Sequence, residues 1–418
     1  MNHKIGNLFK GDKVIWMVFL FLCLISVVEV FSASSTLTYK SQNFLGPLIY
    51  HSGMIFFGVF VAIVTLNIPC RYFKVVTPLL LFITFGTLLW VLIGGESING
   101  ANRVIKIATF TFQPSEIAKG TMVLAAAQIL SAMQRPDGKG ADDKAMKYVL
   151  FIVMPAIFLI GIENLSTAGL LFIVIFLMMF IARVPIAQMG KLTGAGVLLI
   201  VVFLTLVLTL GSFGQSSDDE QEEQTTQVAK GNKDEIKGGG VFHRFATWRN
   251  RILKHSGPVD DDPEHYDIDK NFQVGHANIA IASSGIIGKG PGNSTERDYL
   301  PQAFSDFIYA IIIEEMGILG AIAVVFLYII LLYRAARIAS RCENNFPAFL
   351  VMGLALLLVI QATINMMVAV ELMPVTGQPL PLISKGGTST IINCAYIGVI
   401  LSVSRSAKKS DAVGADGD

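Results

Sequence analysis

The stretch GIIGKGPGNSTERDYLPQAFSDFIYAIIIEEMG, residues 285–317, joins a polar, glycine-rich loop to an apolar helix. The loop ends at Ser305 and Asp306, and the apolar run that begins there carries Glu314 and Glu315. A carboxylate is costly to place in a bilayer, and carboxylates found there are usually functional. The stretch therefore predicts a membrane-spanning helix with a functional carboxylate at its polar end.

The composition of the whole chain indicates a polytopic membrane protein. Of its 418 residues, 53% are hydrophobic and only 15% are charged, against about 25% in soluble domains. The net charge of +1 gives no indication of a nucleic-acid partner. Ten apolar runs approach the roughly 20 residues that cross a bilayer, and the first is predicted to be a retained span, not a cleaved signal. These runs are 14–33, 47–68, 77–95, 114–133, 148–162, 166–182, 192–212, 306–333, 346–370 and 383–404.

The distribution of basic residues predicts the orientation. Lys and Arg concentrate in the short loops on the side of both termini, so the positive-inside rule places both termini in the cytoplasm. The expected organisation is seven spans in 1–212, an extracytoplasmic loop at 213–305, three spans in 306–404 and a cytoplasmic tail at 405–418. Within the loop, the polar segment 213–240 is expected to be disordered, and 241–305 to be partly ordered at the membrane surface.

Asp306 has two interpretations. It could be an ordinary acid in the first turn of a helix capped by Ser305, stabilised by the helix dipole. It could instead be a general base, because a carboxylate half out of water suits proton abstraction. Both interpretations can hold together.

Three further charged groups lie inside predicted spans. Glu116 and Lys119 are spaced i, i+3 on one helix face, where they could simply neutralise each other or could order the floor of a polar cavity. Glu314 is expected to pair with a buried basic group or to face water, because a carboxylate facing lipid is not credible.

Outward-facing basic residues are candidates for anion binding. Arg103 and Lys106 could hold a phosphate or could be ordinary anchors at the membrane surface. Lys289, in GIIGKGPG, could cradle an anion together with backbone N–H groups, although such a loop is more often a turn.

The segment PVTGQPLPLISKGG, residues 374–387, cannot form a regular helix because it holds three prolines and three glycines. At membrane depth such backbone must line protein or water, so a re-entrant or cavity-lining segment is expected, with Ser384 as a candidate substrate contact. The four cysteines and six histidines have no metal-ligand spacing, and no disulfide is expected.

Three motifs occur in order along the chain: QPSEIAK at 113–119, preceded by NGANRVIKI; LPQAFSDFIY at 300–309, followed by EEMG; and PVTGQPLP at 374–381. Together they resemble the motifs of the SEDS proteins (shape, elongation, division and sporulation), the polytopic peptidoglycan polymerases of bacteria. The resemblance covers essentially the whole membrane domain. The sequence resembles the division type (FtsW-like) more than the elongation type (RodA-like). This judgement rests on overall sequence features, which include GDKVIWMVF and SASSTL near the N-terminus.

The resemblance implies that Asp306 is the catalytic carboxylate. It also implies roles for the pair Glu116 and Lys119 and for the external Arg103. The chain departs from the family pattern at three positions. Asn164 stands where an acid is usual, so that role does not carry over, although the neighbouring Glu163 could substitute; Gln302 replaces a Glu, and Lys385 replaces an aromatic residue.

The function that the resemblance implies is polymerisation of lipid II by an inverting peptidoglycan glycosyltransferase. Asp306 would be the base, and undecaprenyl diphosphate would leave. No cofactor is specified, although a divalent cation (Mg²⁺ or Mn²⁺) could neutralise the diphosphate. The implied partners are a class B penicillin-binding protein and other divisome proteins, and the implied location is the inner membrane at the septum. The alternatives are a lipid II flippase and a non-catalytic activator of a transpeptidase.

Overall fold

The computed structural model describes residues 10–33, 46–98, 101–107, 110–210, 272–300 and 303–415. Each of the ten predicted apolar runs coincides with a helix. Within the described residues, eight of these helices are long and apolar enough to cross a membrane, α8 is shorter, and α6 carries buried charges. The protein is therefore an all-α polytopic membrane protein. The helices are α2 (Lys13–Ala33), α4 (Gly46–Asn67), α5 (Cys70–Gly94), α6 (Pro114–Ala132), α7 (Ala145–Glu163), α8 (Leu165–Ile181), α9 (Ile186–Leu210), α13 (Ile308–Ala339), α14 (Asn345–Ala369) and α15 (Thr388–Ala415).

Two helix boundaries differ from the sequence prediction for identifiable reasons. Helix α5 begins at Cys70 instead of 77, because Pro69 precedes the helix as its N-cap and Pro78 is accommodated within it. Helix α15 begins at Thr388 instead of 383, because Lys385 N donates to Phe304 O and the carbonyls of Gln378 and Ile383 accept from side chains of other helices. An apolar run thus predicts that a helix is present more reliably than it predicts where the helix begins and ends.

Helix α14 lies at the centre of the first structural unit, where it packs against α6, α8, α13 and α15. Gly353 makes this packing close: a Cβ there would lie 2.6 Å from Val123 Cγ1 of α6 and 2.7 Å from Met178 Sδ of α8. Small residues at such crossings let membrane helices approach closely. Helix α9 belongs to a second unit, Ile186–Asn271 with Met373–Val375.

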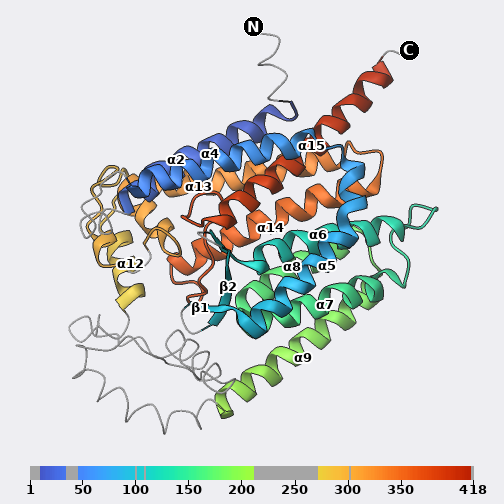
Figure 1. Ribbon diagram of the computed structural model, residues 1–418, viewed down its shortest axis with the longest axis horizontal. Helices are drawn as coiled ribbons and strands as arrows, with labels where there is room; N and C mark the ends of the chain where they lie inside the picture. Colours follow the sequence, from blue (N-terminus) through green and yellow to red (C-terminus); the bar gives the residue numbers. More distant parts are fainter. Residues whose placement is uncertain are drawn as a thin grey trace. The chain divides into compact units, whose positions relative to one another are not determined.

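One end of this helix bundle carries most of the irregular structure (Figure 1). Helix α12 (Phe272–Ala282), the short η2 (Glu296–Asp298) and a small sheet lie there. The antiparallel sheet has the order β1 (Glu96–Ile98), β2 (Ala101–Ile107) and β3 (Phe110–Phe112). The sequence analysis did not predict these strands, although the β-branched residues of VIKI favour them. Residues 133–144 connect α6 to α7 at the opposite end (Figure 1).

The predicted segment 213–240 and residues 241–271 lie outside the described part of the chain, as does Gln302. Residues 272–300 are described, and they form α12, a glycine-rich turn and η2 before the chain enters the bundle.

Gly317 interrupts α13 and receives the glycine-rich loop. Its φ is +70°, and a Cβ there would lie 2.3 Å from Ile286 O. We expect Gly317→Ala to destabilise the fold by about 1–3 kcal/mol, because alanine is strained at this backbone conformation and has no space. Thermal unfolding in detergent measures the effect, with Gly169→Ala of α8 as control because nothing lies near its Cβ position. Equal melting temperatures for the two variants would contradict this packing.

Asp12 fixes the start of α2 to α13. Its carboxylate accepts hydrogen bonds from the N–H groups of Val14 and Ile15 and from the guanidinium of Arg334. Burial alone would raise the pKa of Asp12, but the Arg334 hydrogen bond and charge, with the two N–H bonds, hold it below its usual value.

A carboxyl with a lowered pKa stabilises the fold above its unfolded pKa and ceases to do so as the pH falls through its folded pKa. We therefore expect the melting temperature of the wild type to fall more steeply than that of Asp12→Asn below about pH 5. Parallel curves for the two proteins would show that Asp12 contributes nothing to acid sensitivity.

Candidate active site

Asp306 lies in a turn just before α13, not in the first turn of the helix. The helix begins at Ile308 with Phe307 as its N-cap residue, so the prediction of a Ser305 cap is wrong. Ser305 Oγ instead donates a hydrogen bond to Asp306 Oδ1 at 3.0 Å. The Asp306 carboxylate is partly exposed.

The backbone of this turn is held by other parts of the protein, which explains why the helix cannot begin earlier. Lys385 N donates to Phe304 O at 2.9 Å, and Ser384 Oγ donates to Ser305 O at 2.6 Å. Asn365 Nδ2 of α14 donates to Asp306 O at 2.9 Å. Three successive carbonyls are therefore fixed from outside, and the Asp306 side chain projects from a rigid support.

The non-helical segment that supplies two of these donors is buried at residues 380–384, as expected of a segment that lines protein. Its own carbonyls are satisfied by side chains from three helices, as buried backbone groups require. The Ser384 hydroxyl also accepts from Leu380 N at 2.7 Å, so both of its bonds are internal. The bonds to carbonyls are Asn365 to Gln378 O (2.8 Å), Gln361 to Pro379 O (3.0 Å), Tyr328 to Pro381 O and Ser26 to Ile383 O (2.6 Å).

The buried ion pair of α6 belongs to the same network. Lys119 Nζ lies 2.8 Å from Glu116 Oε1 and 2.7 Å from Gln361 Oε1. Because Gln361 in turn donates to Pro379 O, the pair both neutralises itself and orders the segment beside Asp306. The mutual neutralisation of the pair is confirmed, and its place at the floor of a polar cavity stays a prediction.

The sequence analysis missed Gln361 and Asn365, the residues that connect these parts. They are spaced i, i+4 on α14 and are 1% exposed. Two amides on one face of an otherwise apolar span are the signal that could have found them. Gln378 Nε2 extends the network to Thr167 Oγ1 of α8 at 2.7 Å.

Glu314 and Lys289 form an ion pair in a second polar cluster. Lys289 Nζ lies 2.6 Å from Glu314 Oε1, and Glu314 also accepts the N–H and hydroxyl of Thr295. Glu315 accepts the N–H of Gly292 at 3.0 Å. The two carboxylates thus anchor the glycine-rich loop to α13, which matches the expected pairing of Glu314 with a basic group.

Arg103 and Lys106 lie in strand β2, where Lys106 pairs with Thr111 of β3. Their side chains are outside the part of the chain that the structure describes.

An apolar groove with a volume of about 280 Å³ lies between α5, α6, α14 and α15. Ile117 and Gly120, which line the groove, are next to the ion pair on α6. Tyr396 also lines the groove, and its hydroxyl donates a hydrogen bond to Glu116 O at 2.6 Å. The groove is lined almost entirely by apolar side chains, so it offers an apolar chain a place next to the buried polar network. Its other lining residues are Phe73, Leu80, Thr121, Leu124, Leu350, Leu354, Ile392, Ala395 and Val399.

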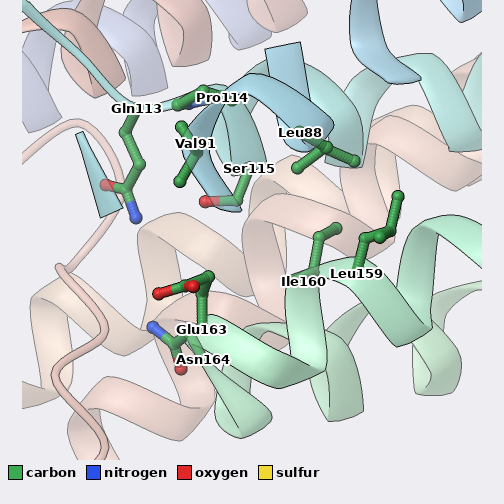
Figure 2. Close-up of a pocket in the computed structure, with 9 residues that line it drawn as sticks. All are labelled: Leu88, Val91, Gln113, Pro114, Ser115, Leu159, Ile160, Glu163 and Asn164. Atoms are coloured by element: carbon green, nitrogen blue, oxygen red, sulfur yellow. The ribbon is translucent and has the colours of Figure 1, made fainter. Parts of the chain in front are cut away.

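A smaller pocket lies where α5, α6 and α7 end or begin (Figure 2). Gln113, Ser115 and Glu163 lie around the space that Figure 2 shows, and the apolar side chains of Leu88, Leu159 and Ile160 lie on one side of it. Asn164 caps α8 by accepting the N–H of Thr167 at 3.2 Å. Glu163 lines this pocket, and its substitution for the missing family acid stays a prediction.

No group of three or more His, Cys, Asp or Glu residues within the described ranges could hold a metal ion. Three buried oxygens of the polar network have no hydrogen-bond partner among the described residues: Glu116 Oε2, Asn365 Oδ1 and Thr376 Oγ1. Buried orphan oxygens indicate sites for water or for polar groups of a ligand.

Comparison with known proteins agrees with this architecture. The model of a family described as cell cycle proteins, that of FtsW, RodA and SpoVE, matches residues 12–231 and 236–409. The "Probable peptidoglycan glycosyltransferase FtsW" of Geobacter metallireducens is 29% identical over 422 residues, covering 98% of this chain and 99% of the relative. The protein of the same name from Geobacter sp. (strain M18) is 27% identical over 400 residues, covering 94% and 96%.

Two solved structures share the fold. A chain of a peptidoglycan synthase complex, described as coordinating polymerization and crosslinking, gives a TM-score of 0.69 at 22% identity and covers 95% of this chain and 98% of its own. The rod shape determining protein RodA of Thermus thermophilus gives 0.61 at 21% identity, covering 96% and 98%. The chain therefore belongs to the SEDS family of cell cycle proteins, which comprises FtsW, RodA and SpoVE, and within that family it resembles the FtsW members.

Proposed function

We propose that this protein is a peptidoglycan glycosyltransferase that polymerises lipid II into β-1,4 glycan strands, with Asp306 as general base. The observation that carries the proposal is the Asp306 turn. Three successive carbonyls, at residues 304–306, are fixed by Lys385, Ser384 and Asn365. The carboxylate remains partly exposed. A fixed carboxylate at the end of a membrane helix suits proton abstraction from a bound sugar hydroxyl.

The reaction is a single displacement. The 4-hydroxyl of the acceptor GlcNAc attacks the anomeric carbon of the donor MurNAc, and Asp306 takes the hydroxyl proton. The bond to the diphosphate breaks, and undecaprenyl diphosphate leaves. One displacement inverts the α-linked donor to a β linkage, so no second carboxylate is needed as a nucleophile.

The apolar groove supports a polyprenyl-linked substrate. Its wall on α6 is continuous with the turn that carries Glu116 and Lys119, and that pair is hydrogen-bonded through Gln361 to the segment beside Asp306. An apolar chain in the groove would therefore lie along the helix that connects to the polar site. A divalent cation such as Mg²⁺ or Mn²⁺ would neutralise the diphosphate and would rely largely on the diphosphate oxygens for its ligands.

The family relationship supports the cellular setting. We propose an inner-membrane protein with both termini in the cytoplasm, acting at the division septum with a class B penicillin-binding protein and other divisome proteins. The synthase complex with the same fold supports the transpeptidase partner.

The rival functions are transport of lipid II and non-catalytic activation of a transpeptidase. The test incubates the purified full-length protein with lipid II in detergent, alone and with a cognate transpeptidase whose own catalytic serine is replaced. Glycan strands resolved by gel electrophoresis support the enzyme. Absence of polymer under both conditions, together with movement of lipid II across proteoliposome membranes, would establish the transporter instead.

A further inference from the structure

Lys385 is a charged residue that the proposed mechanism does not yet use. It lies between the buried Ser384 and the glycines that precede α15, and its side chain is only partly exposed. Its Nζ lies 4.7 Å from the centre of the Phe304 ring. It forms no ion pair with any described carboxylate. Partial burial lowers the pKa of Lys385, because it removes water from the ammonium without supplying an opposite charge.

The backbone at Lys385 is held as firmly as the Asp306 turn. Its N–H donates to Phe304 O, and the neighbouring Ser384 donates to Ser305 O. One residue further back, Ile383 O accepts from Ser26, which also shares a hydrogen bond of 2.8 Å with His51 of α4. Lys385 is therefore held against the turn that carries Asp306, through its backbone N–H and through its side chain over the Phe304 ring.

We propose that Lys385 binds the diphosphate of a polyprenyl diphosphate, the donor's leaving group, at the turn that carries Asp306. An ammonium has three N–H donors, so one that directs an N–H to an aromatic ring keeps the others for phosphate oxygens to accept. Helix α15 begins three residues later, and its N-terminal dipole adds a field that favours an anion. The identity of the lipid rests on the proposed function.

The test measures equilibrium binding of radiolabelled undecaprenyl diphosphate to the full-length protein in phosphatidylcholine nanodiscs. Lys385→Gln is expected to raise the Kd at least about tenfold, which corresponds to about 1.4 kcal/mol, because it removes a charge-assisted hydrogen bond to phosphate. Lys385→Arg is expected to stay within about threefold of the wild type because it keeps the charge. Undecaprenol, which lacks phosphate, should not distinguish the wild type from Lys385→Gln.

Lys74→Gln is the matched control. Lys74 also lies over a phenylalanine ring, 6.0 Å from the centre of Phe346, but it belongs to the other end of the helices. The Lys74→Gln variant should bind undecaprenyl diphosphate with the same Kd as the wild type. Each variant is first checked for an unchanged melting temperature, and Lys385→Arg provides the comparison if Lys385→Gln is unstable.

Equal Kd values for the wild type and Lys385→Gln would overturn the assignment. So would displacement of the lipid by phosphatidylglycerol at equal concentration, which would make the site one for phospholipid headgroups. Because the assay needs no turnover, the two proposals can fail separately. If Lys385 contributes to binding but no polymer forms, the proposed glycosyltransferase activity is wrong. If polymer forms and the Kd of Lys385→Gln equals that of the wild type, only the assignment of Lys385 is wrong.

Discussion

Asp306→Asn is expected to lower the rate of glycan synthesis from lipid II by about 10²–10⁴-fold, the usual contribution of a general base. Asparagine has nearly the same shape and can still accept the hydrogen bond from Ser305, so the turn should keep its structure. The three external bonds to residues 304–306 are made by carbonyls and do not depend on the carboxylate. The loss should therefore appear in the rate and not in the melting temperature.

Asp298→Asn is the matched control for this experiment. It makes the same substitution eight residues earlier, at an exposed position in η2, and should leave the rate of polymerisation unchanged. If the two variants polymerise lipid II equally well, Asp306 is not the base. If Asp306→Asn lowers the melting temperature so far that unfolding accounts for the lost activity, the role of Asp306 is structural.

Glu116→Gln is expected to destabilise the protein by about 3–5 kcal/mol, because it leaves the fully buried ammonium of Lys119 without its counter-charge. The loss should also reach the active site, since Lys119 holds Gln361 and Gln361 holds Pro379 O. Thermal unfolding in detergent measures the stability, and the polymerisation assay measures the consequence for the site.

The double variant Glu116→Gln/Lys119→Met separates charge from packing. Removing both charges should recover part of the stability lost in Glu116→Gln, because no unpaired buried charge remains. Asp143→Asn is the control: it breaks the exposed Arg135–Asp143 pair, which should cost about 1 kcal/mol or less. A double variant less stable than Glu116→Gln, or equal losses in Asp143→Asn and Glu116→Gln, would contradict the role of the buried pair.

The sequence predicted the helices because membrane crossing imposes a length and a composition that any 20-residue window reveals. It also predicted that residues 374–387 leave helical geometry, because proline and glycine fix that locally. It could not predict where α13 begins. That boundary depends on Ser384, Lys385 and Asn365 donating to a turn as many as 81 residues away in the chain, and no local pattern records such contacts.

The sequence indicated the charged residues of the candidate site but not the hydrogen bonds that join them. Asp306, Glu116 and Lys119 were identified from their charge within apolar sequence, but the amides that join them are neutral and less conspicuous. The small sheet was missed because its strands are only three to seven residues long. Glu314 and Lys289 were each singled out, and only the folded chain brings them together.

The single-turnover rate of Asp306→Ala at saturating lipid II, with and without added formate, tests the central claim most directly. If the Asp306 carboxylate is the base, the variant should bind lipid II but transfer glycan slowly, and formate should restore part of the rate where chloride at the same ionic strength does not. A rate equal to that of the wild type without formate would contradict the account.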